Sequence, residues 1–381
     1  MKTSTQPQKP CVLIVENSID ITGALKSIVR ACIYNAVNFD FVFLLPEKSK
    51  ASQWLRVQGF KQVEYLPMLE LNKSFKSFIY YFPVLISNTW KLKKIVQHYK
   101  VDIIHNNDLY NLLPVSLLIF GVKIPYITHI RFLPNRFPKP IYLFWVRIHL
   151  FFSENMIAVS NHLADSLPKS SKIHTIYNEL PIEITQDPIF KPVHRERVFL
   201  YLSNYIQGKG QDYAIKAFAS ASDHLQEWKL RFVGGDMGLE KNLVYKRNLL
   251  TLSKELGVED KIEWRGFTND VETEYKQAEI VLNFSESESF SLTCLEAIYF
   301  GTPVIATKSG GPAEIIVHGK SGYLVENKDI QGMSDAMKVL AKNDEFRREI
   351  NLLGSSLMEE KFNPQRTSKR LSDLYKQVLS L

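Results

Sequence analysis

Residues 278–307 read AEIVLNFSESESFSLTCLEAIYFGTPVIAT. A β-branched run (278–285) leads into a polar turn, a helical pattern and a second β-branched run (302–307). A strand, a helix and a strand in succession favour a parallel sheet that is covered by helices. Ligands of such sheets bind beyond the carboxyl ends of the strands, so the polar turn is a candidate binding loop.

Strands and helices alternate along the rest of the chain. Residues 179–196 interrupt the alternation with three prolines and no helical period, which predicts a linker. We therefore expect an α/β fold of two tandem Rossmann-like domains facing a cleft, over residues 1–185 and 186–364. The helix at 365–381 has an apolar stripe and is expected to pack back on the first domain. The predicted strands are 11–16, 39–45, 63–68, 101–106, 124–130, 156–160, 173–178, 197–203, 230–235, 261–267, 278–285, 302–307 and 322–326, and the predicted helices of the first half are 22–36, 74–99, 109–120 and 161–168.

Length and composition fit a soluble two-domain protein of 381 residues, 45% hydrophobic and 23% charged. The polar N-terminus, MKTSTQPQKP, lacks a signal-peptide core, which predicts a cytoplasmic location. The three cysteines, Cys11, Cys32 and Cys294, lie far apart within apolar patterns. They argue against a disulfide framework and a thiolate metal site, and we expect them to be buried and reduced.

Positive charge is concentrated in the first half of the chain. Residues 51–150 hold 13 Lys and Arg against 4 Asp and Glu, whereas residues 191–381 hold 26 against 27. The basic segments 73–82, 88–100 and 131–152 are interleaved with aromatic residues. This pattern favours peripheral contact with an anionic membrane, or an anionic acceptor. The alternative is a set of solvated helix faces whose aromatic residues lie in the core.

Two glutamates in the opening stretch, Glu288 and Glu296, are eight positions apart. Eight helical positions correspond to a rotation of about 80°, so these carboxylates do not form one acid–base pair on a helix face. The helix is expected to begin near Ser289 or Ser291, and its N-terminus would suit a phosphate. Carboxylates that accept from hydroxyls would suit a sugar beside that phosphate. The alternative is a helix cap followed by a solvent-facing glutamate.

Other short motifs exclude some functions. The segment GKGQDY (208–213) fails as a dinucleotide fingerprint because Tyr213 occupies the third glycine position. The chain has no Asp-x-Asp sequence, so the metal-dependent type of sugar transfer is not suggested. His105 and His129 could bind a metal only with help from carboxylates, and as isolated residues both are more typical of strand ends. Asp108 is expected to cap the helix at 109–120.

The run from Glu288 to Thr307, with GGPAEII (310–316) and GKSGYLV (319–325), resembles the E-x7-E signature region of the family 4 retaining glycosyltransferases. These enzymes have the fold called GT-B. The segment LSNYIQGKGQDYAIKAF (202–218) is similar to the family's strand–turn–helix with its Lys-Gly pair. Looser matches extend through the first half, at 102–111, 126–130, 157–165 and 173–180.

The resemblance implies roles for residues of the second domain. Glu296 would hold the ribose hydroxyls, and Glu288 would contact hydroxyls of the donor sugar. Lys209 would neutralise the diphosphate. The resemblance places the backbone N–H groups of Ser289, Phe290, Ser291 and Leu292 against sugar and phosphate, and Arg265, Gly266 and Phe267 near the base.

In the first domain the resemblance implies that Gly23 brings backbone close to phosphate and that His129 faces the sugar. The expected catalytic residues are Glu288, His129 and Lys209. Asn204 stands where the family often has an arginine beside the diphosphate, and it joins the expected nucleotide-sugar-binding residues. Ser289 and Ser291 replace glycines of the family, and their hydroxyls are expected to influence the choice of sugar.

The implied reaction is transfer of a hexosyl group from a nucleotide diphosphosugar to a hydroxyl of a glycan or lipid-linked acceptor, with retention. The resemblance implies that it needs no metal or other cofactor. It also implies no carboxylate nucleophile, since the departing diphosphate would take the acceptor proton. The expected setting is surface polysaccharide or glycolipid synthesis, with no nucleic-acid partner. The alternatives are a GT-B epimerase of nucleotide sugars and a non-catalytic nucleotide-sugar-binding protein.

Overall fold

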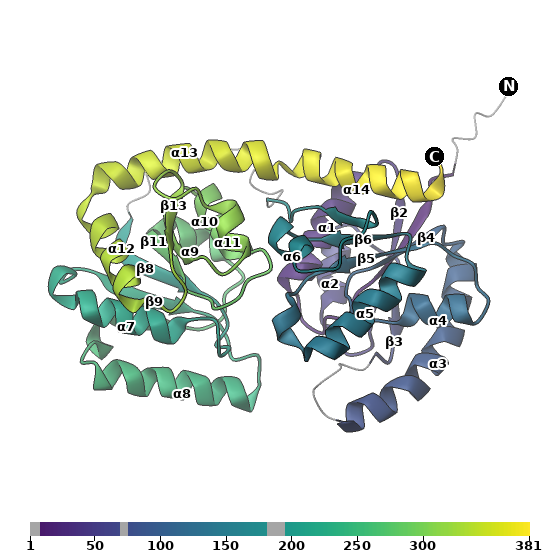
Figure 1. Cartoon of the computed structure of the whole chain (residues 1–381), viewed down its shortest axis with the longest axis horizontal. Coiled ribbons are helices and arrows are strands. Elements are labelled where there is room, and N and C mark those ends of the chain that lie inside the picture. Colours follow the sequence, from purple (N-terminus) through teal and green to yellow (C-terminus); the bar gives the residue numbers. More distant parts are fainter. Residues whose placement is uncertain (1–7, 69–74, 181–194) are drawn as a thin grey trace. The chain divides into compact units, whose positions relative to one another are not determined.

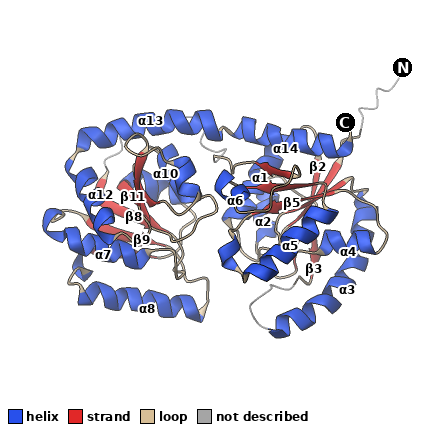
Figure 2. Cartoon of the chain, viewed as in Figure 1, coloured by secondary structure: helices blue, strands red, loops and turns tan. Residues whose placement is uncertain are grey.

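The computed structural model describes residues 8–68, 75–180 and 195–381, which form two α/β units. Unit 1 comprises Met1–Glu179 and Pro364–Leu381, and unit 2 comprises Leu180–Asn363. Each unit is a parallel sheet flanked by helices (Figures 1 and 2). Most of the predicted linker, residues 181–194, lies outside the described residues.

Unit 1 contains a seven-stranded parallel sheet in the order β3-β2-β1-β4-β5-β6-β7. Its strands are β1 (Cys11–Val15), β2 (Asp40–Pro46), β3 (Val63–Leu66), β4 (Ile103–Asn106), β5 (Tyr126–Ile130), β6 (Asn155–Ala158) and β7 (Ile173–Thr175). Its helices are α1 (Gly23–Asn35), α2 (Ala51–Val57), α3 (Phe75–Tyr99), α4 (Leu113–Ile119), α5 (Lys139–Phe152), α6 (Asn161–Asp165) and α14 (Pro364–Leu379).

Unit 2 contains a six-stranded parallel sheet in the order β10-β9-β8-β11-β12-β13. Its strands are β8 (Glu196–Leu202), β9 (Lys229–Val233), β10 (Ile262–Arg265), β11 (Ala278–Asn283), β12 (Val304–Thr307) and β13 (Gly322–Val325). Its helices are α7 (Gln211–Ala221), α8 (Glu240–Glu255), α9 (Val271–Gln277), α10 (Leu292–Tyr299), α11 (Gly311–Ile315), α12 (Ile330–Lys342) and α13 (Asp344–Phe362).

Both sheets reverse their strand order at one point, between β1 and β4 in unit 1 and between β8 and β11 in unit 2. At such a reversal the loops that follow the two strands run to opposite faces of the sheet and leave a crevice. The residues that follow β1, β4, β8 and β11 are therefore the ones positioned to meet a ligand.

Helix α14, at the end of the chain, completes the core of unit 1. Leu371, Leu374 and Tyr375 are buried among apolar side chains of α1 and the sheet, including Ile28 and Phe39. The apolar stripe on this helix therefore covers the α1 side of the unit (Figure 1).

All thirteen predicted strands are present, with ends that differ by up to three residues. Helices α2 and α5 lie where the sequence patterns assigned none. The capping role expected of Asp108 is wrong, because α4 begins only at Leu113. Asn111 instead accepts from the Leu113 N–H at 2.9 Å, and the preceding turn carries Asp108 outside the helix. The three cysteines are buried thiols, as expected.

Candidate functional site

Lys209 and Glu288 meet at the strand-order reversal of unit 2. Lys209 lies in the loop after β8, Glu288 lies in the loop after β11, and Lys209 Nζ is 2.7 Å from Glu288 Oε1. The Lys209 side chain is 33% exposed and that of Glu288 is 14% exposed, so the pair is open to solvent on one side. These two sequence-predicted residues thus form a single polar site.

The loop carrying Lys209 is fixed to the end of β11. The buried hydroxyl of Tyr201 donates to the carbonyl oxygen of Lys209 and accepts from the N–H of Phe284 at 2.8 Å. Gly210 has a left-handed φ of 82°, and a Cβ there would collide with the carbonyl of Phe284. Only glycine fits so close an approach in this backbone conformation. The Lys-Gly pair is therefore a rigid support for the ammonium group.

The turn carrying Glu288 is held by backbone bonds to the loop after β12. The N–H of Glu288 donates to the carbonyl of Ser309 at 2.9 Å, and its own carbonyl accepts from Gly311 at 2.9 Å. A Cβ at Gly311 would collide with the backbone of Phe290, whose side chain is buried. Of Phe290, only the backbone can therefore meet a ligand.

Helix α10 begins beside this turn, with Ser291 as its N-cap. Ser291 has a left-handed φ of 84°, and its hydroxyl oxygen accepts from Cys294 N at 3.3 Å and Asn283 Nδ2 at 2.8 Å. These bonds, together with the burial of Ser291, direct the hydroxyl into the protein. Ser289 is half-buried, and Leu292 opens the helix. Of the two serines, only Ser289 has a side chain that could extend toward a sugar.

Glu296 lies farther along α10 and has a different neighbour. Its Oε2 is 3.4 Å from the hydroxyl of Tyr275, a fully buried residue of α9. Glu288 and Glu296 therefore occupy separate environments, which agrees with two separate hydrogen-bond acceptors rather than one acid–base pair.

Asn204 and Phe267 lie close together at the ends of β8 and β10. Asn204 Oδ1 accepts from the Gly235 N–H at 3.0 Å, and a Cβ on Gly235 would lie 3.4 Å from Phe267 Cβ. Phe267 is 65% exposed and Gly266 is exposed as well, so a flat aromatic face is available to a nucleobase.

Arg265, which was expected near the nucleobase, is already paired with carboxylates. Its guanidinium lies 2.9 Å from Glu274 and 3.6 Å from Glu263, at the edge of a cluster around the buried Arg231. This arrangement leaves the Arg265 side chain 40% exposed but tied to carboxylates. Arg265 is therefore positioned by the fold rather than by a ligand.

In unit 1, Gly23 and His129 occupy very different surroundings. Gly23 is exposed at the first position of α1, after the cap Thr22. His129 is buried near the end of β5, with Nδ1 3.3 Å from His105 Nε2 and its own Nε2 without a partner among the described residues. Burial, followed by the charge of Arg131, lowers the pKa of His129 well below its ordinary value. His129 is therefore neutral.

A polar cluster that the sequence patterns did not reveal lies at the strand-order reversal of unit 1. Glu16, Asn107 and Arg131 each directly follow a strand, β1, β4 and β5. Arg131 donates to Asn107 Oδ1 at 2.7 Å and to Asn178 Oδ1 at 2.8 Å, and Asn107 donates to Glu16. Burial lowers the pKa of Arg131 to about 10, still well above neutrality. The only sequence signal was one polar residue after each strand.

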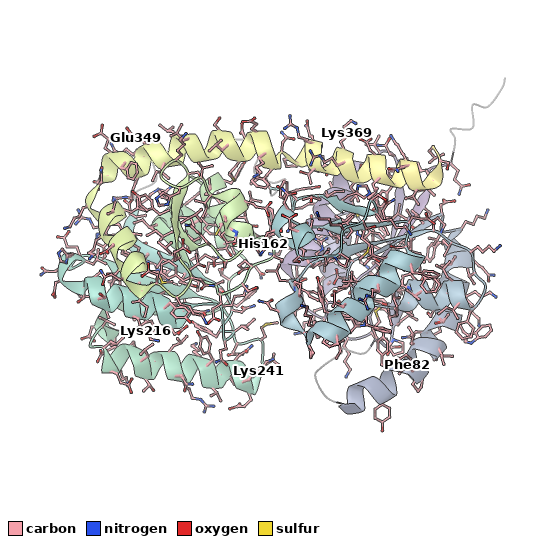
Figure 3. All side chains as sticks on the ribbon, in the orientation of Figure 1. Phe82, His162, Lys216, Lys241, Glu349 and Lys369 are labelled. Atoms are coloured by element: carbon pink, nitrogen blue, oxygen red, sulfur yellow. The ribbon has the colours of Figure 1, made fainter. Side chains whose placement is uncertain are left out.

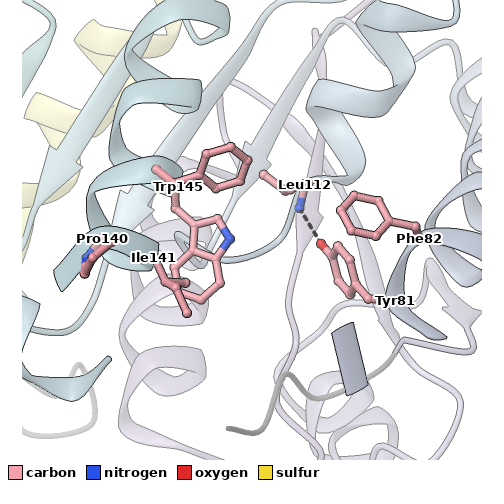
Figure 4. A pocket seen from close by; sticks show the side chains of 7 residues that line it. Tyr81, Phe82, Leu112, Pro140, Ile141 and Trp145 are labelled. Atoms are coloured by element: carbon pink, nitrogen blue, oxygen red, sulfur yellow. Dashed lines mark hydrogen bonds between the residues drawn. The ribbon is translucent and has the colours of Figure 1, made fainter. Parts of the chain in front are cut away.

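Unit 1 also has an apolar cavity of about 220 Å³ that contains none of the sequence-predicted site residues (Figure 4). Tyr81 and Phe82 of α3 face Ile141 and Trp145 of α5 across it. The Leu112 N–H donates to the Tyr81 hydroxyl oxygen at 3.1 Å. The lining residues are Tyr81, Phe82, Leu112, Pro140, Ile141, Phe144 and Trp145.

Helix α3 exposes an apolar stripe next to this cavity. Phe82, Ile86 and Trp90 follow one another at intervals of four residues, and all three are about half exposed or more. Phe82, labelled on α3 in Figure 3, also lines the cavity. Lys91 and Lys94 are exposed beside the stripe, and Lys93 lies over the Trp90 ring at 5.7 Å. These aromatic residues are thus at the surface rather than in the core.

Within the described residues, no group of three or more His, Cys, Asp or Glu is arranged to hold a metal ion. In the same part of the chain, none of the helices has the length and apolar character needed to span a bilayer.

Both units match known protein families. The family described as "Glycosyltransferase Family 4" matches residues 64–183, and that described as "Glycosyl transferases group 1" matches residues 184–352. The N-acetyl-alpha-D-glucosaminyl L-malate synthase of Bacillus anthracis is 28% identical over 245 residues, covering 61% of this chain and 62% of that protein. The alignment thus spans less than two thirds of the length of this curated relative.

Solved structures show the same fold over nearly the whole chain. The Anabaena protein HepE, crystallised with UDP and glucose, has a TM-score of 0.81 at 19% identity and covers 96% of this chain and 99% of its own. The sucrose-phosphate synthase of Thermosynechococcus elongatus has a TM-score of 0.80 at 16% identity, with 98% and 100% covered. With two contiguous family matches from residue 64 to residue 352, the chain belongs to the family 4 glycosyltransferases and has their GT-B fold.

Proposed function

We propose that this chain transfers a hexosyl group from a nucleotide diphosphosugar to a hydroxyl group, with retention of configuration and without a metal ion. The observation that carries the proposal is the Lys209–Glu288 pair at the strand-order reversal of unit 2, beside the N-terminus of α10. A cation and free helix N–H groups suit a diphosphate, and a neighbouring carboxylate suits sugar hydroxyls.

In this proposal the protein supplies position and charge rather than a covalent nucleophile. Lys209 and the first turn of α10 stabilise the negative charge that develops on the departing diphosphate. Glu288 orients the sugar ring, and the diphosphate oxygen accepts the proton of the attacking hydroxyl on the same face. Binding both substrates in a fixed geometry provides the remaining acceleration.

The nucleotide is proposed to occupy the end of the unit 2 sheet. Glu296 would accept from the ribose hydroxyls, and the exposed ring of Phe267 would stack on the base. The relatives support a nucleotide-sugar donor, since HepE was crystallised with UDP and glucose and the Bacillus anthracis relative is named for an N-acetylglucosaminyl product.

The acceptor is proposed to be a glycan or lipid-linked molecule, which unit 1 would bind while in contact with an anionic membrane surface. The exposed stripe of Phe82, Ile86 and Trp90 would enter the interface, and the adjacent lysines would meet anionic headgroups. The apolar cavity between α3 and α5 would take part of the apolar chain of the acceptor.

Release of UDP or GDP from a panel of nucleotide sugars, with and without acceptors, tests the reaction. A transferase releases the nucleotide fastest with one donor and an added acceptor, and its activity survives EDTA. Free sugar or an epimer formed without acceptor would favour an epimerase. Binding without turnover of any donor would favour a non-catalytic protein, and strong inhibition by EDTA would contradict the metal-free reaction.

Liposome flotation tests the membrane contact. Each lysine near an anionic surface contributes about 1 kcal/mol, so the triple variant Lys91→Gln, Lys93→Gln, Lys94→Gln should bind about 100-fold more weakly. The control exchanges three exposed lysines of unit 2, Lys241, Lys254 and Lys342, and should bind like the unaltered protein. Equal binding to neutral and anionic vesicles would contradict the proposal.

A further inference from the structure

Three buried side chains form a chain of contacts from the C-terminal helix to His129. The Tyr375 hydroxyl of α14 is 2.6 Å from His105 Nδ1 on β4. His105 Nε2 is 3.3 Å from His129 Nδ1 on β5. Tyr375 and His105 are fully buried, and His129 is 5% exposed. All three residues belong to unit 1, so their contacts lie within one compact unit.

The hydrogen atoms along this chain follow from what each group can donate. A neutral imidazole has one N–H and one acceptor nitrogen. Among the described residues, His105 is the hydrogen-bond partner of the Tyr375 hydroxyl. That hydroxyl must donate to His105 Nδ1, because otherwise its hydrogen is buried without an acceptor. His105 then carries its hydrogen on Nε2 and donates to His129 Nδ1.

The charge states are consistent with this assignment. Burial, and next the charge of Arg131, lowers the pKa of His105 to about 3, and the same two causes lower that of His129. Burial raises the pKa of the Tyr375 hydroxyl well above its ordinary value, so the hydroxyl keeps its hydrogen. At neutral pH the chain therefore consists of a phenol and two neutral imidazoles.

We propose that Tyr375 sets the tautomer of His129 through His105, so that His129 presents an N–H at Nε2 to a ligand oxygen. Nε2 is the one polar atom of His129 that is buried without a partner among the described residues. In this tautomer His129 donates a hydrogen bond and cannot act as a base toward the ligand. The ligand atom it meets carries a lone pair, as a sugar hydroxyl or a phosphoryl oxygen does. Placing that oxygen on the donor sugar rests on the proposed function.

Tyr375 and His105 are positioning residues in this scheme, since they act through His129. Long-range ¹H–¹⁵N NMR of the full chain labelled with [¹⁵N]histidine at neutral pH reads each tautomer directly, with His129→Gln assigning the His129 signals. The unaltered protein should show both His105 and His129 protonated on Nε2. Protonation of His129 on Nδ1 would overturn the proposal, and this spectrum decides the point even if a variant does not fold.

Tyr375→Phe then tests the source of the tautomer. Without the hydroxyl, His105 Nδ1 no longer has to accept, so the Nδ1–H form of His129 should appear. The control is Tyr142→Phe, which removes another buried hydroxyl of unit 1, one that donates to the Phe132 carbonyl at 3.2 Å. It should leave both tautomers unchanged. A Tyr375→Phe spectrum identical to that of the unaltered protein would also overturn the proposal.

Turnover gives a second readout. Loss of one fixed hydrogen bond to the ligand corresponds to a fall of about 2- to 10-fold in kcat/KM for the nucleotide sugar, with Tyr142→Phe as the reference. If the protein transfers no sugar at all, the proposed function fails, while the tautomer assignment still stands or falls on the spectra.

Discussion

Lys209 Nζ lies 2.7 Å from Glu288 Oε1, so the carboxylate expected to meet sugar balances the charge of the cation expected to meet phosphate. Both groups retain exposure to solvent, which screens their attraction. An incoming diphosphate therefore adds to an existing ion pair, and Lys209 can share its three hydrogen-bond donors between the two partners.

Replacing Lys209 should weaken nucleotide binding strongly. A hydrogen bond to a charged group contributes about 1.5–3 kcal/mol, so Lys209→Met should lower the affinity for UDP or GDP by about 10- to 100-fold in calorimetry. Lys216→Met, on the next helix, removes a half-exposed lysine 3.7 Å from Asp212 and serves as the control. If Lys209→Met binds UDP and GDP with unchanged affinity, Lys209 does not contact the bound nucleotide.

Substitutions of the two glutamates should separate nucleotide binding from sugar transfer. Glu296→Ala should lower nucleotide affinity by about 10- to 100-fold, because the ribose hydroxyls lose a charged acceptor. Glu288→Ala should still bind nucleotide, because Lys209 stays available to the diphosphate, but it should lose sugar transfer because the sugar loses its carboxylate partner. Calorimetry with UDP and GDP, together with donor turnover, distinguishes the two. If both variants bind and turn over like the unaltered protein, the assignment of the glutamates is wrong.

Substitutions at Ser291 should reveal backbone strain. A side chain at a left-handed φ of 84° costs about 1–3 kcal/mol, which the cap and the bond from Asn283 offset. Ser291→Ala keeps the strain and loses both bonds, whereas Ser291→Gly loses the bonds but relieves the strain. Ser291→Ala should therefore unfold at the lower temperature in calorimetric scans. Equal losses in both variants would show that strain at this position is unimportant.

Glu179 should make stability depend on pH. Burial raises the pKa of its carboxyl to about 8, and the Ser368 hydroxyl donates to Oε1 at 2.6 Å. Between about pH 4.5 and pH 8 the unfolded chain has lost this proton while the folded chain keeps it. The free energy of unfolding therefore falls as pH rises through that window, by at most about 1.4 kcal/mol per unit.

Glu179→Gln keeps a neutral acceptor for Ser368 and removes the titration. Its stability relative to the unaltered protein, from urea unfolding at several pH values, should increase from pH 5 to pH 8 and then level off. Buried histidines such as His105 have the opposite effect, because they lower the free energy of unfolding as pH falls. They are common to both proteins, so their effect cancels in the difference. A difference that does not vary with pH would mean that Glu179 is ionised when folded.

The sequence was a good guide to strands and to the unit 2 loops. Most strands are short apolar runs that contain β-branched residues. Lys209 stands between two glycines, and Glu288 is marked by its eight-residue spacing to Glu296. Helix α5 was not recognised, because its aromatic residues follow prolines and obscure a helical period. The Arg131 cluster could not be foreseen, since its members are brought together by strand order. Likewise, the left-handed backbone that turns the Ser291 hydroxyl inward has no sequence signal.

The contribution of α14 to the core of unit 1 has a consequence for synthesis on the ribosome. Unit 1 is interrupted by Leu180–Asn363, and Tyr375 reaches its place in the core only after that insertion has been translated. At about 5–20 residues per second this takes on the order of 10–40 s. During that interval unit 2 can fold as a continuous domain, while unit 1 remains incomplete because α14 does not yet cover the α1 side of its core. Unit 1 is thus the first to begin emerging and the last to be completed.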